Sequence, residues 1–351
     1  MEGKLIRLVL VMIMWHVETS WCSAVDCRRE VRCRISYTHR MKAADCFRKE
    51  FKEFPKCLPT DIEVLELTYN RIRTVTQDDL SKFSYLKFLY LQDNLISELD
   101  DDVFSEMDEL MTLDLSINAL RSVPATVFQL PSLKTLYLSQ NRNINIIDTL
   151  EGARPINSPL TQVDISYTTG KEDATEFPYF GPMPFLASLN VSGNQYYSLK
   201  PKHFLGLCRL QILITDNVTI DFDDPCDCWI VNKWLLDNEV RFTPFYCNAG
   251  RSKCLNHTIP DEDQKVFQQC NAVNAEIQRQ HKMYKLSVGL IVFFIVLLLC
   301  ITLYFTVFRR HCMKHCCKKS TRKTRAKDES IPVSSALLSN TQKSVPNEYV
   351  L

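Results

Sequence analysis

The sequence predicts an α/β solenoid, with short parallel strands stacked along a concave face, disulfide-bonded caps at both ends, and one transmembrane helix. Three observations predict this class: an eleven-residue phrase recurs along the chain, cysteines gather at the two edges of the repeated region, and 23 uncharged residues follow it. The charges nearly cancel, with 42 Lys and Arg against 41 Asp and Glu, so nucleic acid is not an expected partner.

The repeated eleven-residue motif is LKFLYLQDNLI from Leu86, and the same pattern of apolar residues and Asn appears in IEVLELTYNRI from Ile62 and LMTLDLSINAL from Leu110. Its ninth position holds Asn70, Asn94, Asn118, Asn141, Thr168 and Asn194, separated by 24, 24, 23, 27 and 26 residues. This is the period of leucine-rich repeats, whose stacked coils share one core. We expect each Asn amide to satisfy backbone groups that a tight bend leaves unpaired. The opposite core wall is predicted to contain Leu80, Phe104, Phe128 and Phe204.

Residues 286–308 contain no charge, and as a helix they would measure about 34 Å, against about 30 Å for the hydrocarbon core of a bilayer. A buried core helix is the alternative, but it should carry polar residues on one face. Nine Lys or Arg and no Asp or Glu occupy 309–327, which predicts a cytoplasmic C-terminus. We therefore expect a single-pass type I protein of the plasma membrane.

The start of the chain has the features of a signal peptide. Lys4 and Arg7 precede an apolar run at 8–15, and Cys22-Ser23-Ala24 offers small residues at the cleavage-site spacing. An uncleaved anchor is the alternative, although the apolar run is too short to span a bilayer comfortably. Cleavage after Ala24 leaves an even number of cysteines outside the membrane.

These ten cysteines are predicted to form disulfides, because an even number in an oxidising compartment indicates pairing. They are Cys27, Cys33, Cys46, Cys57, Cys208, Cys226, Cys228, Cys247, Cys254 and Cys270. Zinc binding by Cys226 and Cys228 is the competing interpretation, which an exported domain with distant cysteines disfavours. We expect neither a metal nor a cofactor.

The cysteine-rich edges resemble those of the extracellular leucine-rich-repeat family. DCRREVRC and DCFRKEFKEFPKCLP are similar to its N-terminal cap, and CDCWIVNKWLL with two later cysteines is similar to its C-terminal cap. The resemblance covers roughly residues 25–270. It implies the bonds Cys226–Cys247 and Cys228–Cys270, with Trp229, Trp234 and Leu235 covering the last coil.

The N-terminal cap departs from the family pattern, because Ile35 stands where a cysteine is expected and Cys57 is extra. We therefore predict the bonds Cys27–Cys33 and Cys46–Cys57. Cys208 and Cys254 remain, and their bond would join the last repeat to the C-terminal cap.

The predicted organisation is a signal peptide (1–24), an N-terminal cap (25–61), about six to seven repeats (62–224), a C-terminal cap (225–270), a juxtamembrane stalk (271–285), the transmembrane helix (286–308) and a cytoplasmic tail (309–351).

Alternate positions of each strand point to the concave face, where aromatic and acidic groups alternate. One column reads Glu66, Tyr90, Asp114, Tyr137, Asp164 and Asn190. The candidate ligand-binding residues are Tyr69, Phe88, Tyr90, Asp93, Asp114, Tyr137, Asp164 and Tyr167. Exposed aromatic groups are typical of protein-binding surfaces, and the alternative is a solvated face that follows the repeat pattern.

Three sequons predict glycosylation at Asn190, Asn217 and Asn256. A glycan on Asn190 would confine ligand binding to repeats one to four. For Asn217 the alternative is a buried repeat Asn without a sugar.

The tail of 43 residues is too short for a folded signalling domain. Cys312, Cys316 and Cys317 lie among basic residues beside the membrane, which predicts S-palmitoylation. The alternatives are reduced thiols or a metal site shared with neighbouring histidines. The final Tyr349, Val350 and Leu351 have the apolar spacing of a PDZ ligand.

The sequence contains no phosphate-binding glycine loop, HExxH or GxSxG motif, so catalysis is not expected. The leading hypothesis is a cell-surface recognition or adhesion receptor, or a co-receptor, that binds an extracellular protein. The resemblance also allows an auxiliary subunit of a membrane channel or receptor complex, acting through the transmembrane helix and basic tail.

Overall fold

The computed structural model describes residues 33–142, 144–169, 174–248, 251–255 and 257–325, with the backbone alone for 251 and 311–325. It divides into two compact units, Met1–Gln278 and Arg279–Leu351. The predicted signal peptide 1–24, Cys27, Asn256 and the final Tyr349, Val350 and Leu351 lie outside the described residues. The side chains of Cys312, Cys316 and Cys317 also lie outside them.

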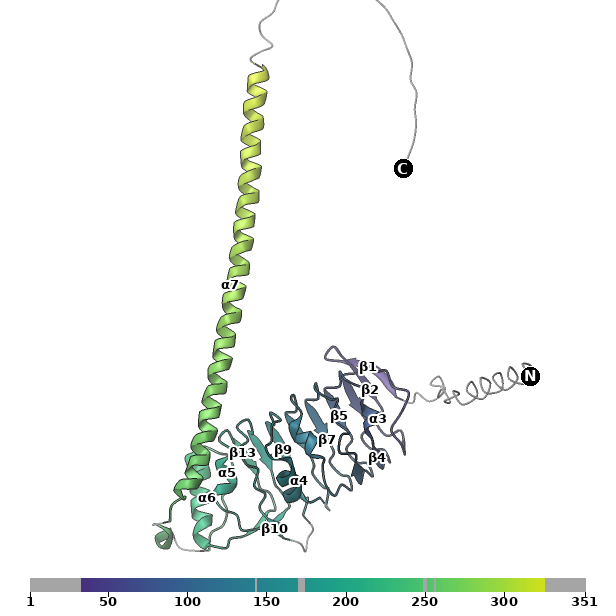
Figure 1. The fold of residues 1–351 in the computed structure, drawn as a ribbon, viewed down its shortest axis with the longest axis vertical. Coiled ribbons are helices and arrows are strands. Elements are labelled where there is room, and N and C mark those ends of the chain that lie inside the picture. The colour runs from purple at the N-terminus through teal and green to yellow at the C-terminus, as the bar shows by residue number, and fades with distance from the viewer. Residues whose placement is uncertain (1–32, 143, 170–173, 249–250, 256, 326–351) are drawn as a thin grey trace, which may run out of the picture. The chain divides into compact units, whose positions relative to one another are not determined.

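The first unit is built on a nine-stranded sheet with the order β1-β2-β3-β5-β7-β8-β9-β11-β13. β1 and β2 form an antiparallel hairpin, and every later neighbour pairs in parallel (Figure 1). The strands are β1 (Arg34–Thr38), β2 (Met41–Asp45), β3 (Val64–Glu66), β5 (Phe88–Tyr90), β7 (Thr112–Asp114), β8 (Thr135–Tyr137), β9 (Gln162–Asp164), β11 (Ser188–Asn190) and β13 (Ile212–Ile214). One strand per repeat follows from the period of the sequence.

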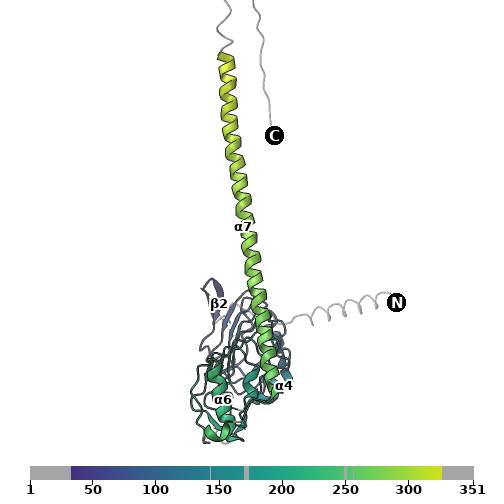
Figure 2. The same ribbon diagram turned by 90° about the vertical axis from the view of Figure 1, so that its left-hand side faces the viewer.

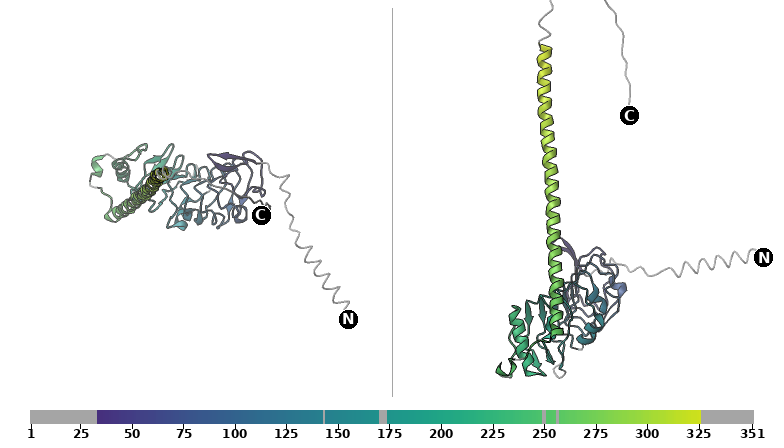
Figure 3. Two further views of the ribbon diagram at one scale, coloured as in Figure 1. Left: turned by 90° about the horizontal axis from the view of Figure 1, so that it is seen from above. Right: turned by 60° about the vertical axis from the view of Figure 1, so that its left-hand side comes forward.

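The return segments and the C-terminal cap carry two small parallel sheets and several helices. Figure 3 shows the ribbon from two further directions. The strands are β4 (Thr74–Val75) and β6 (Glu98–Leu99) in one sheet, and β10 (Thr175–Glu176), β12 (Gln195–Tyr197) and β14 (Thr219–Asp221) in the other. The helices are α3 (Gln77–Leu80), η1 (Ala125–Gln129), α4 (Ile146–Ala153), α5 (Lys202–Leu205), α6 (Pro225–Asp237) and η2 (Arg251–Cys254).

The hydrophobic core lies between the strands and the return segments. The middle residue of each parallel repeat strand is buried: Leu65, Leu89, Leu113, Leu136, Val163, Leu189 and Leu213. The predicted opposite wall is confirmed, since Leu80, Phe104, Phe128 and Phe204 are also buried. Each such side chain contributes about 1.5 to 3 kcal/mol relative to exposure, so repetition multiplies a modest local gain.

The repeat asparagines connect successive coils by side-chain hydrogen bonds. Nδ2 of Asn94 donates to the carbonyls of Leu67 and Leu91, both at 3.0 Å, and its Oδ1 accepts from the Ile72 N–H at 3.1 Å. Asn70, Asn118, Asn141 and Asn194 make equivalent bonds. This confirms the predicted role of the ninth position. Thr168 differs, because its hydroxyl donates to the Ile165 carbonyl.

Helix α7 (Asp261–Arg325) is continuous over 65 residues (Figure 2). It begins inside the predicted C-terminal cap, where Phe267 packs against Trp234 with ring centroids 5.5 Å apart. Trp234 and Leu235 are buried, as the resemblance implies, while Trp229 is half-buried. Within the described residues, Asp261–Arg310 is the one helical stretch long and apolar enough to cross a membrane, and its most apolar window of 18 residues has a mean hydropathy of 3.1.

Candidate functional site

The predicted concave column is a continuous strip on the outer face of the main sheet. Cross-strand pairing aligns Glu66 with Tyr90, Tyr90 with Asp114, and so on through the column. We call these six residues the strip: Glu66, Tyr90, Asp114, Tyr137, Asp164 and Asn190. All six are half-buried, and the residue that precedes each of them on its strand is buried. The predicted strand phase is therefore confirmed.

The carboxylates of the strip are fixed by backbone hydrogen bonds. Oε1 of Glu66 accepts from the N–H two residues later at 2.7 Å, and Oδ1 of Asp114 and of Asp164 accept equivalent bonds at 2.9 and 2.8 Å. Each acidic side chain thus satisfies a donor at the turn that ends its strand. The sequence analysis predicted Asp114 and Asp164 as ligand contacts, with a solvated face as the alternative, and it missed this role, which the repeated Asp-x-Ser pattern could have indicated.

Electrostatic coupling runs along the strip. Burial is the main cause that raises the pKa of Tyr90 above its usual 10.0, and the carboxylates of Glu66 and Asp114 raise it further. Burial likewise raises the pKa of Tyr137, with Asp114 and Asp164 adding to the effect. Burial also raises the pKa of Asp114, although its hydrogen bonds from Ser116 oppose the shift. The tyrosines remain neutral phenols in a negative field.

The three other predicted contacts near the turns have a shared backbone conformation. Tyr69, Asp93 and Tyr167 have φ of 58°, 52° and 55°, in the left-handed region. They follow the strands at one repeat position and flank the strip. Phe88, by contrast, lies on β5 and pairs with Val64 in the neighbouring column. The eight candidate residues are therefore spread over three columns.

An aromatic cluster at the N-terminal end contains two residues that the sequence analysis missed. The rings of Phe47 and Tyr69 meet edge to face at 5.4 Å, and the Arg48 guanidinium lies 4.7 Å from the Tyr69 ring centroid. Phe47 is 41% exposed and Tyr69 is 42% exposed, so the cluster is open to solvent. The spacing of Phe47 and Arg48 follows no repeat, because they belong to the cap.

The two described sequons differ in their surroundings. Both polar atoms of the Asn190 side chain are hydrogen-bonded. Oδ1 accepts from the Ser192 N–H at 3.1 Å, and Nδ2 donates to Asp164 Oδ2 at 3.0 Å. Asn217 is exposed at a left-handed turn position, with φ of 55°. The alternative of a buried Asn217 was wrong, because Asn217 is exposed and the repeat position of the other asparagines falls one residue later, at the half-buried Val218.

The bond in the N-terminal cap joins Cys33 to Cys46, with Cα atoms 4.4 Å apart. The predicted pairs Cys27–Cys33 and Cys46–Cys57 were therefore wrong. The physical reason is the β1–β2 hairpin, which pairs Arg34 with Asp45 and so brings the adjacent cysteines together. Cys57 is disulfide-bonded as well.

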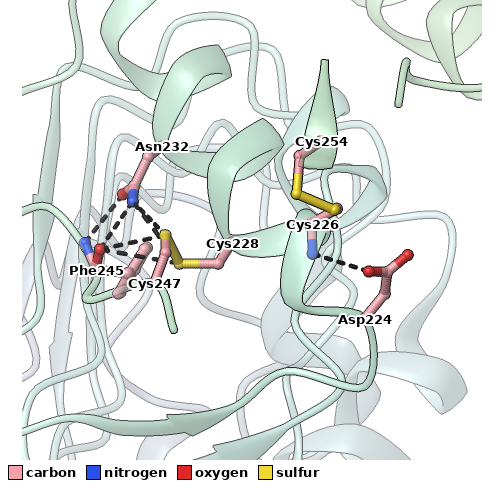
Figure 4. The surroundings of a disulfide bond; sticks show 7 residues. All are labelled: Asp224, Cys226, Cys228, Asn232, Phe245, Cys247 and Cys254. Carbon is pink, nitrogen blue, oxygen red and sulfur yellow. Dashed lines mark hydrogen bonds between the residues drawn. A yellow bond between two sulfur atoms is a disulfide. The ribbon is translucent and has the colours of Figure 1, made fainter. Parts of the chain in front are cut away.

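The C-terminal bonds are Cys208–Cys270, Cys226–Cys254 and Cys228–Cys247. The predicted pairs Cys226–Cys247, Cys228–Cys270 and Cys208–Cys254 were wrong. The reason is that α7 brings Cys270 against the last repeat, with its Cα 5.9 Å from that of Cys208. Figure 4 shows the other two bonds, both made by cysteines of α6.

Asn232 supports this arrangement, because it exchanges hydrogen bonds with the backbone of Phe245 at 2.8 and 2.9 Å (Figure 4). Asp224, Cys226 and His257 are close enough together to consider a metal. The Cys226 sulfur is bonded to Cys254, however, so no thiolate is available there. The zinc interpretation of Cys226 and Cys228 fails for the same reason.

The parallel strands recur every 23 to 27 residues, their middle residues are buried, and the repeat asparagines bond to successive coils, an arrangement called here the asparagine ladder. These features define a leucine-rich-repeat solenoid. Residues 84–142 match the protein family described as Leucine rich repeat. The chain is therefore a leucine-rich-repeat protein with disulfide bonds near the ends of its repeats.

The platelet glycoprotein Ib alpha chain of Mus musculus is 33% identical over 110 residues, which cover 31% of this chain and 15% of that protein. Tsukushi-A of Xenopus laevis is 28% identical over 180 residues, which cover 51% of this chain and 50% of that protein. The chain thus spans half or less of the length of these two relatives. The crystal structure of human 5T4 (Wnt-activated inhibitory factor 1, trophoblast glycoprotein) aligns with a TM-score of 0.47 at 19% identity, covering 60% of this chain and 77% of that chain.

Proposed function

We propose that this protein is a cell-surface recognition receptor or co-receptor that binds an extracellular protein through the strip and has no catalysis of its own. The observation that carries the proposal is the strip itself. Its tyrosines are half-buried and held on a rigid sheet, and its carboxylates are fixed by backbone donors. Pre-ordered aromatic groups lose little entropy on binding and commonly serve as energetic anchors.

The proposal includes a single membrane crossing at 286–308, within the apolar helix α7, with the N-terminus outside the cell. Support comes from the basic run that follows the apolar segment and from the disulfides of the first unit. An epitope tag placed after Ala24 should be detected by antibody on intact cells, whereas a tag after Leu351 should require permeabilisation. The opposite pattern would overturn the topology and, with it, the extracellular site.

The binding test uses the full chain on the cell surface and a proximity-labelling screen for its extracellular neighbours. For a neighbour confirmed with purified protein, Tyr90→Ala with Tyr137→Ala should weaken binding by at least about 2 kcal/mol. A matched control is Tyr85→Ala, because Tyr85 is 62% exposed and lies off the strip. Normal binding by the double variant, with normal surface expression, would favour a solvated strip.

The auxiliary-subunit hypothesis makes a different prediction. Replacement of 286–351 by an unrelated transmembrane helix and tail should leave ligand binding intact in a recognition receptor. An auxiliary subunit should lose its effect on the assembled complex, since that effect would depend on the helix and the basic tail. This exchange separates the two hypotheses without knowledge of the strip.

A further inference from the structure

The strip has a second regularity beyond its chemistry. Glu66, Asp114 and Asp164 occupy every second rung of the sheet, and Tyr90 and Tyr137 occupy the rungs between them. The order is uninterrupted even where the repeat lengthens, because Tyr137 still pairs directly with Asp164. Carboxylate and aromatic side chains therefore alternate with a constant step.

The distance between successive carboxylates determines which repeating ligand could place one group on each of them. Neighbouring strands are about 4.8 Å apart, so carboxylates on alternate rungs are spaced by about 9.6 Å. A polyproline II helix rises about 3.1 Å per residue with three residues per turn, so equivalent side chains recur every 9.3 Å or so on one face. A β-strand places side chains on one face about 6.7 Å apart, which does not match.

Charge favours a cationic partner. Beside the strip, Lys87 is paired with Glu63 at 2.6 Å and Lys42 with Asp61 at 2.5 Å, so two nearby ammonium groups are already neutralised. Asp45 extends the acidic column by one rung at the N-terminal end, where it pairs with Glu66. Lys134 is exposed and directly precedes β8, the strand that carries Tyr137. At the N-terminal end the Arg48 guanidinium lies over the Tyr69 ring, but the six residues of the strip themselves include three carboxylates and no cation.

The tyrosines of the strip provide aromatic contacts for the residues of a ligand that lie between its cations. Aromatic rings between the carboxylates offer apolar faces for pyrrolidine rings and π-faces for cations. The backbone hydrogen bond to each carboxylate holds it in one orientation, so binding would cost little side-chain entropy. A polyproline II segment is itself pre-ordered, which lowers the cost on the other side.

We propose that the strip binds a polyproline II segment carrying Lys or Arg at every third position. Its cations would contact Glu66, Asp114 and Asp164, and its intervening residues would pack on Tyr90 and Tyr137. This inference rests on the proposed binding function of the same strip and names the class of partner.

The test uses the full chain in lipid nanodiscs and fluorescent peptides of proline and lysine. One peptide has lysine at every third position, and a second has the same composition with the lysines grouped at one end. The first should bind at least about tenfold more tightly by fluorescence anisotropy. Equal affinity would show attraction by charge alone and would overturn the spacing argument.

Isosteric variants isolate the strip from the rest of the surface. Asp114→Asn keeps the acceptor for the Ser116 N–H, so folding should be preserved while the charge is lost. With Glu66→Gln added, binding of the three-spaced peptide should fall at least about tenfold. Asp108→Asn with Glu106→Gln removes the same two charges at exposed positions off the strip, so it is the charge-matched control and should change nothing.

The outcomes also separate this inference from the proposed function. If Tyr90→Ala with Tyr137→Ala abolishes binding of a purified extracellular neighbour but the spaced peptide does not bind, the receptor proposal stands and the polyproline II inference is wrong. If the spaced peptide binds wild type and the double tyrosine variant equally, the strip is not its site and the inference is also wrong.

Discussion

The asparagine ladder allows a prediction in which two chemically identical substitutions have different costs. Asn141 and Asn118 occupy the same repeat position and make corresponding bonds. Asn141→Ala removes the acceptor of the Leu120 N–H and the donor to the Leu138 carbonyl. The following coil offers no replacement, because Thr168 donates to its own coil.

Asn118→Ala leaves fewer groups unpaired. The Leu115 carbonyl keeps the bond from Asn141 at 2.9 Å, and the Leu91 carbonyl keeps the bond from Asn94 at 3.0 Å. Among the described bonds, the Ile96 N–H is the group that loses its acceptor. Asn118 is also half-buried, so water can reach the site, whereas Asn141 is fully buried.

An unsatisfied buried polar group costs about 1 to 3 kcal/mol. Asn141→Ala, with two such groups, should lower the free energy of unfolding by about 2 to 6 kcal/mol, and Asn118→Ala by about 1 to 3 kcal/mol. The assay uses residues 25–280 expressed for secretion, which leaves out the predicted signal peptide and transmembrane helix. Unfolding in urea is monitored by circular dichroism and tryptophan fluorescence. Equal destabilisation by the two variants, or less than about 1 kcal/mol for Asn141→Ala, would refute the group-by-group reasoning.

Three further predictions concern single sites. Cys228→Ser breaks the bond to Cys247 and should cost about 2 to 5 kcal/mol, seen as reduced secretion; peptide mapping that found a different partner for Cys247 in wild type would contradict the pairing. Gly193→Ala should lower the free energy of unfolding by roughly 1 to 2 kcal/mol because Gly193 has a φ of +69°. It should lower it further because the added Cβ would lie 2.1 Å from the Tyr167 ring. The double variant with Tyr167→Ala should therefore regain part of the lost thermal stability. Burial lowers the pKa of His203 from 6.5 to about 4. Below pH 6.5 the imidazole is protonated in the unfolded chain but still neutral in the folded one, so the free energy of unfolding should fall by about 3 kcal/mol between pH 6.5 and 4. His203→Gln should flatten this decline in denaturation midpoints, and an unchanged slope would rule out His203 as the cause.

The repeat architecture was predictable because it depends on local spacing. The apolar residue in the middle of each parallel repeat strand of the main sheet is buried, and its flanking residues must then face outward. The alignment of Tyr90 with Asp114 follows from their shared position in successive repeats, since parallel coils stack in register. The asparagine ladder follows too, because each tight bend leaves the same backbone groups unpaired.

The sequence by itself thus determined the solenoid, its core and the strand phase of the candidate site. Only the tertiary structure decided the disulfide pairing, because a bond requires two Cα atoms within about 7 Å and spacing along the chain does not measure that distance. Cys270 reaches Cys208 across 62 residues only after α7 has packed on the last coil.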